Sequence, residues 1–488
     1  MGLLFWVTDL GPGLSGDSRG YFETARSLLQ GYGFQDRGMA MTHHAPGYPV
    51  LVAAATLIDG DMMRAARWLH VFFYGTNILL ITAAAYVSSR ENALAVLFSV
   101  LAIISSGDLL VVYSTAQSES PFIAFALASF IFLSIHIATQ RWSRLVASAV
   151  FLGLAMATRY VGVTLLPPIL ICLFLMDRQP MAHRVRKCVF LSCVALLPLA
   201  AWVLRNLMVT GSTTDRTLLF HPVSLDQVKQ GILTMCNFYF PSQFINSPVN
   251  MPYLNAWLKL ALLVFIGVFV AIQFYRHDLD ARAKTFQTLA IMFCATYVSF
   301  ILLSISFFDA STPLDSRILS PVFVFSLIAV VSLCSANRRW IRRLSVTFLF
   351  AVLFANAPHE AAVATDLHQN GWGYSGREWR ESKTVDFVRS FGTALTVYSN
   401  GPDAIYLLTG RRAEWVPAKL LSVTNLIPAK DFVPRTWAMC DDIAYKGAIV
   451  VYFNDLLSRI PLLTEEELQE ACDVSVIHRF PDGVIYGK

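Results

Sequence analysis

The chain has 488 residues, of which 55% are hydrophobic and only 15% are charged. Its mean hydropathy of +0.54 is higher than ordinary soluble enzymes sustain, so the composition excludes that class and predicts a polytopic α-helical membrane protein. The net charge of +5 is small, and we expect membrane lipids, but no nucleic acid, as partners. The eight cysteines show no CxxC spacing, and no Walker A, GxGxxG or HExxH motif occurs.

The chain begins with seven residues that are almost all apolar, followed by Asp9 and Gly11-Pro12-Gly13. This run is far shorter than the about 20 residues that a membrane span requires. It also lacks the basic start of a signal peptide. We therefore expect it to be the tail of a first crossing whose beginning is absent from this chain.

A polar stretch from Gly16 to Pro49 stands out in the first third of this apolar chain. It opens with the carboxylate of Asp17, and the spacing of its apolar residues predicts an amphipathic helix over 18–30. An acid, an aromatic residue, two histidines and a turn in one membrane-surface loop, about 15–60, indicate a site rather than a connector. The other residues concerned are Tyr21, His43, His44, Pro46 and Pro49.

About ten apolar segments after this loop are long enough to cross, or nearly to cross, the hydrocarbon core of a bilayer. With the partial first crossing they predict about 10–11 transmembrane helices. We also expect a short interfacial helix over 47–57. The predicted spans are 65–88, 92–107, 118–138, 143–158, 160–177, 186–208, 256–276, 285–308, 316–335 and 339–357.

The basic residues predict the orientation of these spans. If the Asp17 loop lies outside the cytoplasm, every inside loop is short and basic, as the positive-inside rule requires. The protein is then a multi-pass protein of the cytoplasmic membrane whose C-terminal region is extracytoplasmic. The inside residues are Arg90, Arg141, Arg144, Arg178, Arg184, Arg186, Lys187, Arg276, Arg282, Lys284, Arg338, Arg339, Arg342 and Arg343.

Two regions lie outside the predicted bundle. The long outer loop at about 209–255 contains aromatic residues that suit either a functional loop or simple anchoring at the membrane surface. Residues 358–488 are richer in charge and predict a small extracytoplasmic α/β domain, attached to a transmembrane module of residues 1–357. Within this domain we expect helices at 383–391 and 464–471, buried strands at 394–399 and 448–453, and a hairpin of 474–480 with 484–486.

Cys440 and Cys472 are the only cysteines of the C-terminal region. An oxidising environment outside the cytoplasm would allow them to form a disulfide. Pairing requires that their Cα atoms lie within about 7 Å of each other.

Charged side chains near apolar spans are rare and costly, so each is a candidate functional residue. Under the orientation above, Glu119, Arg159, Arg205 and Arg317 all fall on the same outer side as Asp17. Guanidinium groups suit a phosphate ligand because their donors form a rigid fork.

A purely structural interpretation stays open for each of these residues. Arginines at span ends commonly anchor the membrane interface, and Glu119 could pair with one of them to hold helices together. Asp17 could cap the helix that follows it. His43 and His44 could close the turn or take part in acid–base chemistry.

The loop from Gly16 to Pro49 resembles the first extracytoplasmic loop of membrane glycosyltransferases with the GT-C fold. The likeness is to the protein O-mannosyltransferase and aminoarabinose transferase group, which uses polyprenyl-phosphate sugars. It rests on the order Asp17-Ser18, Tyr21, Ala25, Leu28-Leu29, Gly31-Tyr32-Gly33-Phe34 and His44-Ala45-Pro46-Gly47-Tyr48-Pro49. In that family an acidic residue at the start of this loop is the catalytic base, which implies this role for Asp17.

The resemblance also implies roles for residues further along the chain. Ser118-Glu119-Ser120-Pro121 is similar to the family's second acidic position, so Asp17 and Glu119 are the expected catalytic residues. The segments around Arg159, Arg205 and Arg317 are similar to its recurrent arginine sites, although Ile318 replaces the commoner tyrosine. The residues expected to bind the substrate or the lipid phosphate are Tyr21, His43, His44, Arg159, Arg205 and Arg317.

The expected activity is the inverting transfer of a sugar from a polyprenyl phosphate to an acceptor hydroxyl of a protein, lipid or glycan. No cofactor is required, and a divalent metal would be compatible with the sequence. A transporter or lipid flippase is the alternative, but it would place charges near the bilayer midplane, often in related halves of the chain. An inactive binding or scaffold protein with the same fold is a third reading.

Overall fold

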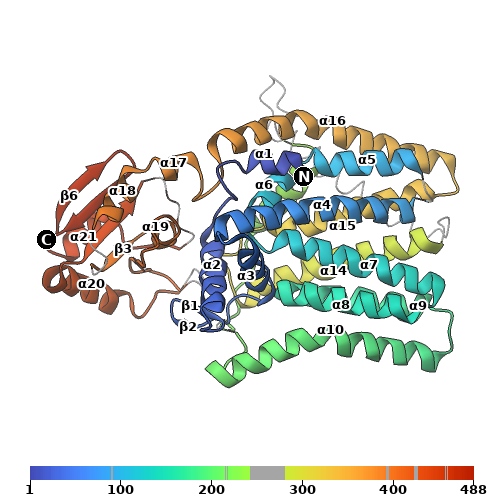
Figure 1. The fold of residues 1–488 in the computed structure, drawn as a ribbon, viewed down its shortest axis with the longest axis horizontal. Helices are drawn as coiled ribbons and strands as arrows, with labels where there is room; N and C mark the ends of the chain where they lie inside the picture. The colour runs from blue at the N-terminus through green and yellow to red at the C-terminus, as the bar shows by residue number, and fades with distance from the viewer. Residues whose placement is uncertain are drawn as a thin grey trace.

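A computed structural model describes residues 1–488 except 90, 91, 215, 217, 242–266, 268–280, 392–394, 422–426, 455, 457 and 459. Figure 1 shows a bundle of long helices with a smaller region containing a β-sheet at one end. Helices α2 (Gly16–Leu29) and α3 (Gly47–Asp59) and the β1–β2 hairpin (Gln35–Asp36 and Met39–Ala40) lie at the end of the bundle that faces this region.

The bundle is formed by helices that are mostly apolar. Packing is most extensive between α7 and α8, α8 and α10, and α14 and α15. Its helices are α1 (Gly2–Val7), α4 (Met62–Ser88), α5 (Ala93–Ile104), α6 (Gly107–Ser114), α7 (Glu119–Thr139), α8 (Trp142–Thr158), η1 (Tyr160–Leu165), α9 (Leu166–Met176), α10 (Met181–Thr210), α11 (Leu225–Tyr239), α14 (Ala281–Phe307), α15 (Ser316–Ser332), η2 (Leu333–Ser335) and α16 (Arg339–Asn370).

Six helices of the described chain are long and apolar enough to cross a membrane, which confirms the polytopic class. Helices α5 and α6 form a pair bent by 63° that would be a seventh span. The predicted spans 143–158 and 160–177 form apolar helices that are shorter than a full span, so the total of about ten stays a prediction. The predicted span 256–276 lies outside the described residues.

The predicted loop 209–255 contains a helix, α11, in its described part. The side chains of Phe238 and Tyr239 at its end are buried, and the ring of Phe238 stacks on Phe323 of α15 with centroids 4.6 Å apart. The idea that these two aromatics anchor a loop at the membrane surface is therefore wrong. They pack inside the bundle because burial removes their large apolar area from water.

The C-terminal region contains a mixed five-stranded sheet in the order β4-β3-β5-β7-β6. Strand β3 is parallel to β4 and β5, whereas β7 is antiparallel to β5 and β6. The expected strands and the hairpin are confirmed. The elements are α17 (Arg377–Arg380), α18 (Lys383–Ser390), β3 (Val397–Ser399), α19 (Pro402–Thr409), β4 (Glu414–Trp415), α20 (Phe432–Lys446), β5 (Ile449–Phe453), α21 (Glu465–Ala471), β6 (Ser475–Phe480) and β7 (Gly483–Gly487).

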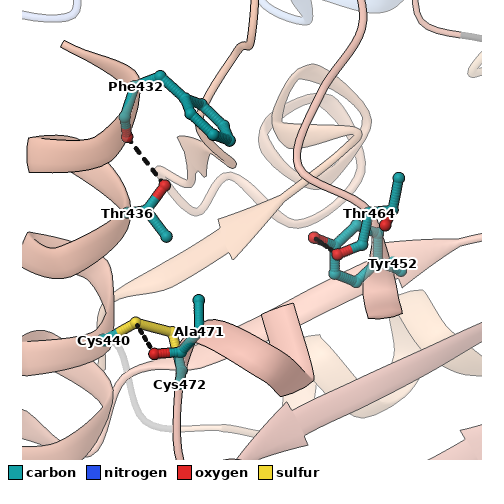
Figure 2. The surroundings of a disulfide bond; sticks show 7 residues. All are labelled: Phe432, Thr436, Cys440, Tyr452, Thr464, Ala471 and Cys472. Atoms are coloured by element: carbon teal, nitrogen blue, oxygen red, sulfur yellow. Dashed lines mark hydrogen bonds between the residues drawn. A yellow bond between two sulfur atoms is a disulfide. The ribbon is translucent and has the colours of Figure 1, made fainter. Parts of the chain in front are cut away.

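A disulfide joins Cys440 of α20 to Cys472 at the end of α21 (Figure 2). The two Cα atoms are 5.1 Å apart, which confirms the predicted pair. The predicted capping box at the start of α21 is also present, because Thr464 and Glu467 each accept a hydrogen bond from the other's backbone N–H.

Helix α16 connects the bundle to the C-terminal region without a break at residue 358, where the composition changes. It contains Pro358 and continues to Asn370, and Gly371 follows with a φ of 69°. A division of the chain at 357 would therefore fall inside a helix.

Candidate active site

Four charged side chains from four different helices meet at the end of the bundle nearest the C-terminal region. Asp17 lies in the first turn of α2 and Glu119 is the first residue of α7. Arg317 lies in the first turn of α15, and Arg159 directly follows α8. The sequence therefore placed these four residues correctly near helix ends, although it did not show how they pair.

The four groups form a chain of ion pairs. Arg317 Nη1 pairs with Asp17 Oδ2 and also donates a hydrogen bond to it. The Nε of Arg317 lies 3.8 Å from Glu119 Oε1, and Arg159 Nη1 pairs with the same Glu119 oxygen. Glu119 is only 1% exposed, so its charge depends on these two arginines. The two carboxylates and the two guanidinium groups together carry no net charge.

The helix macrodipoles favour three of these four positions. A carboxylate is stabilised near a helix N-terminus, as for Asp17 and Glu119, and a guanidinium near a C-terminus, as for Arg159. Arg317 lies in the first turn of α15, where the helix macrodipole disfavours a positive charge. Its cationic charge is held there by Asp17 and Glu119, and it is the group of the four least explained by local helix stability.

The start of α2 is fixed by backbone pairing on both sides. Gly13 pairs with Thr115, and Leu14 pairs with Gly373. Only glycine fits at 373, because φ is 58° and a Cβ would lie 2.0 Å from the carbonyl oxygen of Leu14. These contacts bring the chain before Asp17 against the segment that leads to Glu119.

Ser15 is the N-cap of α2, in a capping box with Ser18. The hydroxyl of Ser18 also donates to the carbonyl of Ala116 at 2.9 Å, and Gln117 Nε2 donates to Ser15 Oγ at 2.8 Å. The interpretation of Asp17 as the helix cap is therefore wrong. Ser15 takes that position two residues earlier, which leaves the carboxylate of Asp17 available to Arg317.

Tyr21 and His44 pack behind this cluster, with ring centroids 4.5 Å apart. The hydroxyl of Tyr21 is within hydrogen-bonding distance of Ser118 Oγ, at 3.3 Å. Burial lowers the pKa of His44 to about 4, although Asp17 opposes this shift. His44 is therefore neutral at physiological pH, and His43 packs edge-on against its ring.

Partial burial alone would raise the pKa of Asp17, but the Arg317 guanidinium overcomes it, with a smaller effect from His44. The net result holds the pKa of Asp17 well below its usual range. The carboxylate is thus ionised at neutral pH but is a weak base while the ion pair persists.

Arg205 makes its hydrogen bonds away from this cluster and holds the first loop in shape. Its Nη1 donates to the carbonyl of Met41 at 2.8 Å, and its Nη2 donates to that of Phe34 at 2.9 Å. Tyr160, which was not among the predicted site residues, donates to the carbonyls of Thr42 and His44. Sequence offers no signal for such contacts with backbone carbonyls, because they exist only once the loop is folded.

A cavity of about 870 Å³ lies between the bundle and the C-terminal region. Asp17 and Arg317 line it, whereas Glu119, Arg159, Arg205 and the predicted aromatic and histidine residues do not. The wall formed by the bundle is largely polar, and that formed by the C-terminal region is largely apolar. The apolar wall includes Trp415, Val416, Ala418, Leu420, Leu421, Leu456, Ile460 and Leu462.

A second charge network joins α2 to the C-terminal region beside the cavity. Arg19 pairs with Asp403 of α19 at 2.8 Å and with Asp36, and Arg37 also contacts Asp403 at 3.2 Å. Arg412 reaches Glu23 at 3.2 Å. These pairs attach the C-terminal region to the helix that carries Asp17.

Within the described part of the chain, no group of three or more His, Cys, Asp or Glu side chains could hold a metal ion. The expectation that no cofactor is required, with a divalent metal compatible, stays a prediction.

Two solved structures are similar to this chain in fold. The structure of ArnT from Cupriavidus metallidurans bound to undecaprenyl phosphate aligns with a TM-score of 0.60 at 13% identity, over 99% of this chain and 96% of that one. The apo structure of the same protein gives 0.58 at 12% identity, over 99% and 95% of the two chains. The fold of this chain is thus GT-C-like, which confirms the resemblance seen in the sequence.

The amino-acid sequence also matches a protein family over part of its length. Residues 43–204 match the family described as dolichyl-phosphate-mannose-protein mannosyltransferase. That segment contains Glu119 and Arg159, but not Asp17 or Arg317. No curated protein sequence matches the chain significantly.

Proposed function

We propose that the protein transfers a sugar from a polyprenyl-phosphate donor to an acceptor hydroxyl, with inversion at the anomeric carbon. The observation that carries this proposal is the pairing of Asp17 with Arg317 on the wall of a cavity at the end of a GT-C-like bundle. A carboxylate and a guanidinium on one wall supply a proton acceptor and a phosphate ligand. The family match and the undecaprenyl phosphate in the similar ArnT structure support this donor class.

In the proposed reaction, Asp17 accepts the proton of the acceptor hydroxyl as its oxygen attacks the anomeric carbon. The bond between that carbon and the phosphate oxygen breaks, and its electron pair stays on the phosphate. Arg317 stabilises the charge that develops on the leaving group, which needs no protonation. Glu119 and Arg159 hold Arg317 from behind, because neither lines the cavity.

The acceptor would enter from the cavity between the bundle and the C-terminal region. Its apolar wall from the C-terminal region would hold the body of the acceptor, and its polar floor would receive the hydroxyl. This arrangement requires the site to face the outside of the cytoplasmic membrane, as the distribution of basic residues predicts. The sugar and the acceptor are not specified by these residues.

A transporter or lipid flippase is less well supported. The four clustered charges lie at helix ends beside the C-terminal region, whereas a transporter is expected to bind its substrate near the bilayer midplane.

The test is transfer by the purified protein in nanodiscs, supplied with a panel of polyprenyl-phosphate sugars and acceptors. Asp17→Asn should lower turnover by about 10²-fold or more, the usual scale for a lost general base. Asp61→Asn is the matched control, because Asp61 is an exposed carboxylate at the N-cap of α4, outside the site. Parent-like turnover in Asp17→Asn would refute the assignment of the base, and Glu119 would be tested next.

A further inference from the structure

We infer, resting on the function proposed above, that the donor phosphate competes with Asp17 for Arg317. Donor binding would then release Asp17 as a base, and the acceptor hydroxyl would be activated only when the donor is in place.

The geometry makes Arg317 the shared partner. It is the one member of the four-residue cluster that contacts both carboxylates, through Nη1 to Asp17 and through Nε, at 3.8 Å, to Glu119. Of these two carboxylates only Asp17 lines the cavity, and its side chain is 37% exposed, against 1% for Glu119. A ligand that enters the cavity therefore meets the Arg317–Asp17 pair and leaves the Glu119–Arg159 pair untouched.

Charge balance explains why the two anions compete. The four-residue cluster has no net charge before the donor binds, and the nearby carboxylate of Asp315, which also acts on Arg317 and lines the cavity, adds a negative charge. A polyprenyl-phosphate sugar is a phosphodiester and adds one negative charge beside a partly buried site. Two anions on one guanidinium would leave a charge uncompensated in a medium of low dielectric constant, so the contact with Asp17 weakens as that with the phosphate forms.

The reaction itself completes the exchange. When the sugar leaves, the phosphate becomes a monoester and gains a second negative charge. At the same step Asp17 takes the acceptor proton and loses its charge. The total charge does not change. Arg317 now lies between a doubly charged phosphate and an uncharged Asp17, so it stays paired with the phosphate.

The consequence is an ordered activation. With Arg317 in place, the pKa of Asp17 lies well below its usual range because the guanidinium overcomes the opposing effect of burial. Moving that guanidinium toward the phosphate returns basicity to the carboxylate, since a nearby positive charge is the main influence that lowers its pKa.

The experiment measures binding of undecaprenyl phosphate, as the probe, to purified protein in nanodiscs. Asp17→Asn removes the competing charge and should tighten binding at least fivefold, whereas the Asp61→Asn control should match the parent protein. Arg317→Gln should weaken binding. Adding Asp17→Asn to Arg317→Gln should then give no gain, because the competition acts through Arg317.

Unchanged or weaker binding in Asp17→Asn, in protein whose thermal unfolding shows it to be folded, would overturn the inference. A fivefold gain that persists in the Arg317→Gln background would overturn it as well, because the two groups would then act independently. If Asp17→Asn unfolds, Asp17→Ser supplies the second measurement. It also removes the competing charge, so undecaprenyl phosphate should again bind at least fivefold more tightly than to the parent protein, and unchanged affinity would refute the competition.

These results are separate from the test of the proposed function. Absence of sugar transfer, combined with tighter binding in Asp17→Asn, would refute the function and leave the competition standing. Transfer with no change in affinity would refute the competition alone.

Discussion

Replacing Arg159 by leucine should destabilise the protein, because it leaves a buried carboxylate without its nearest partner. Glu119 is 1% exposed, and in Arg159→Leu its remaining cation is the Nε of Arg317 at 3.8 Å. That arginine is also bound to Asp17. Removal of one partner from a buried ion pair costs about 3–5 kcal/mol.

The magnitude can be converted into a shift of the unfolding temperature. Unfolding entropies of about 2 cal/mol/K per residue give roughly 1 kcal/mol/K for a chain of 488 residues. Arg159→Leu should therefore lower the midpoint by about 3–5 °C. Thermal unfolding of detergent-solubilised protein, followed by light scattering and intrinsic fluorescence, measures this shift.

A second substitution isolates the cause. Glu119→Gln removes the stranded charge, so the double variant should be more stable than Arg159→Leu alone. Arg144→Leu is a control, because Arg144 is an arginine of the same helix, α8, outside the cluster. If Arg159→Leu unfolds at the parent temperature, or if the double variant is no better than the single one, the idea of a charge-balanced cluster is wrong.

Three further predictions concern the surroundings of the site. Arg205→Lys should leave the first loop more open to proteolysis while undecaprenyl phosphate binds with unchanged affinity, because lysine cannot span both carbonyl groups; a fall in affinity would instead place Arg205 at the phosphate. The folded state keeps His44 neutral with a pKa of about 4, below the ordinary 6.5, so the stability of the parent relative to His44→Gln should be fully present above pH 6.5 and lost by about 3 kcal/mol as the pH falls to 4; a difference that does not change with pH would refute the shift. Cys440→Ser with Cys472→Ser should lower the stability of the C-terminal region by roughly 3–4 kcal/mol, the value expected for a loop of this length, with little effect on binding of the lipid phosphate; limited proteolysis of the full chain measures the loss, and an unchanged cleavage rate would contradict it.

The sequence predicted the charged cluster because ionisable residues at the ends of apolar spans are rare. The charges of Glu119, Arg159 and Arg317 could be assigned to the side of Asp17 from the positive-inside rule alone. Their pairing could not be predicted, since the order of residues along a chain does not determine which helix ends become neighbours. Arg205 was assigned to the same side by the same rule, but it is not part of the cluster. It holds the first loop by donating hydrogen bonds to backbone carbonyls.

Helix boundaries were predicted less well than helix positions. Asp17 was a plausible N-cap by residue type. The N-cap is instead Ser15, so α2 begins at Gly16, two residues before the predicted start. The end of α16 was missed because a change of composition at 358 does not end a helix, and Pro358 is accommodated within it. Phe238 and Tyr239 are residue types that often anchor a protein at the membrane surface, but here both are buried. Their packing against α15 could not be predicted, because it arises only when the chain folds.

The continuous helix α16 also sets how the cavity tolerates changes in chain length. Its 32 residues correspond to a rod of about 48 Å that begins in the bundle and ends immediately before Trp372 and Tyr374 on the cavity wall. One residue inserted or deleted within this rod would rotate those two side chains by about 100° and shift them by about 1.5 Å. The length of α16 thus determines where two side chains of the cavity wall lie. Insertions and deletions among proteins of this architecture should therefore avoid α16 and occur in the loops on either side of it.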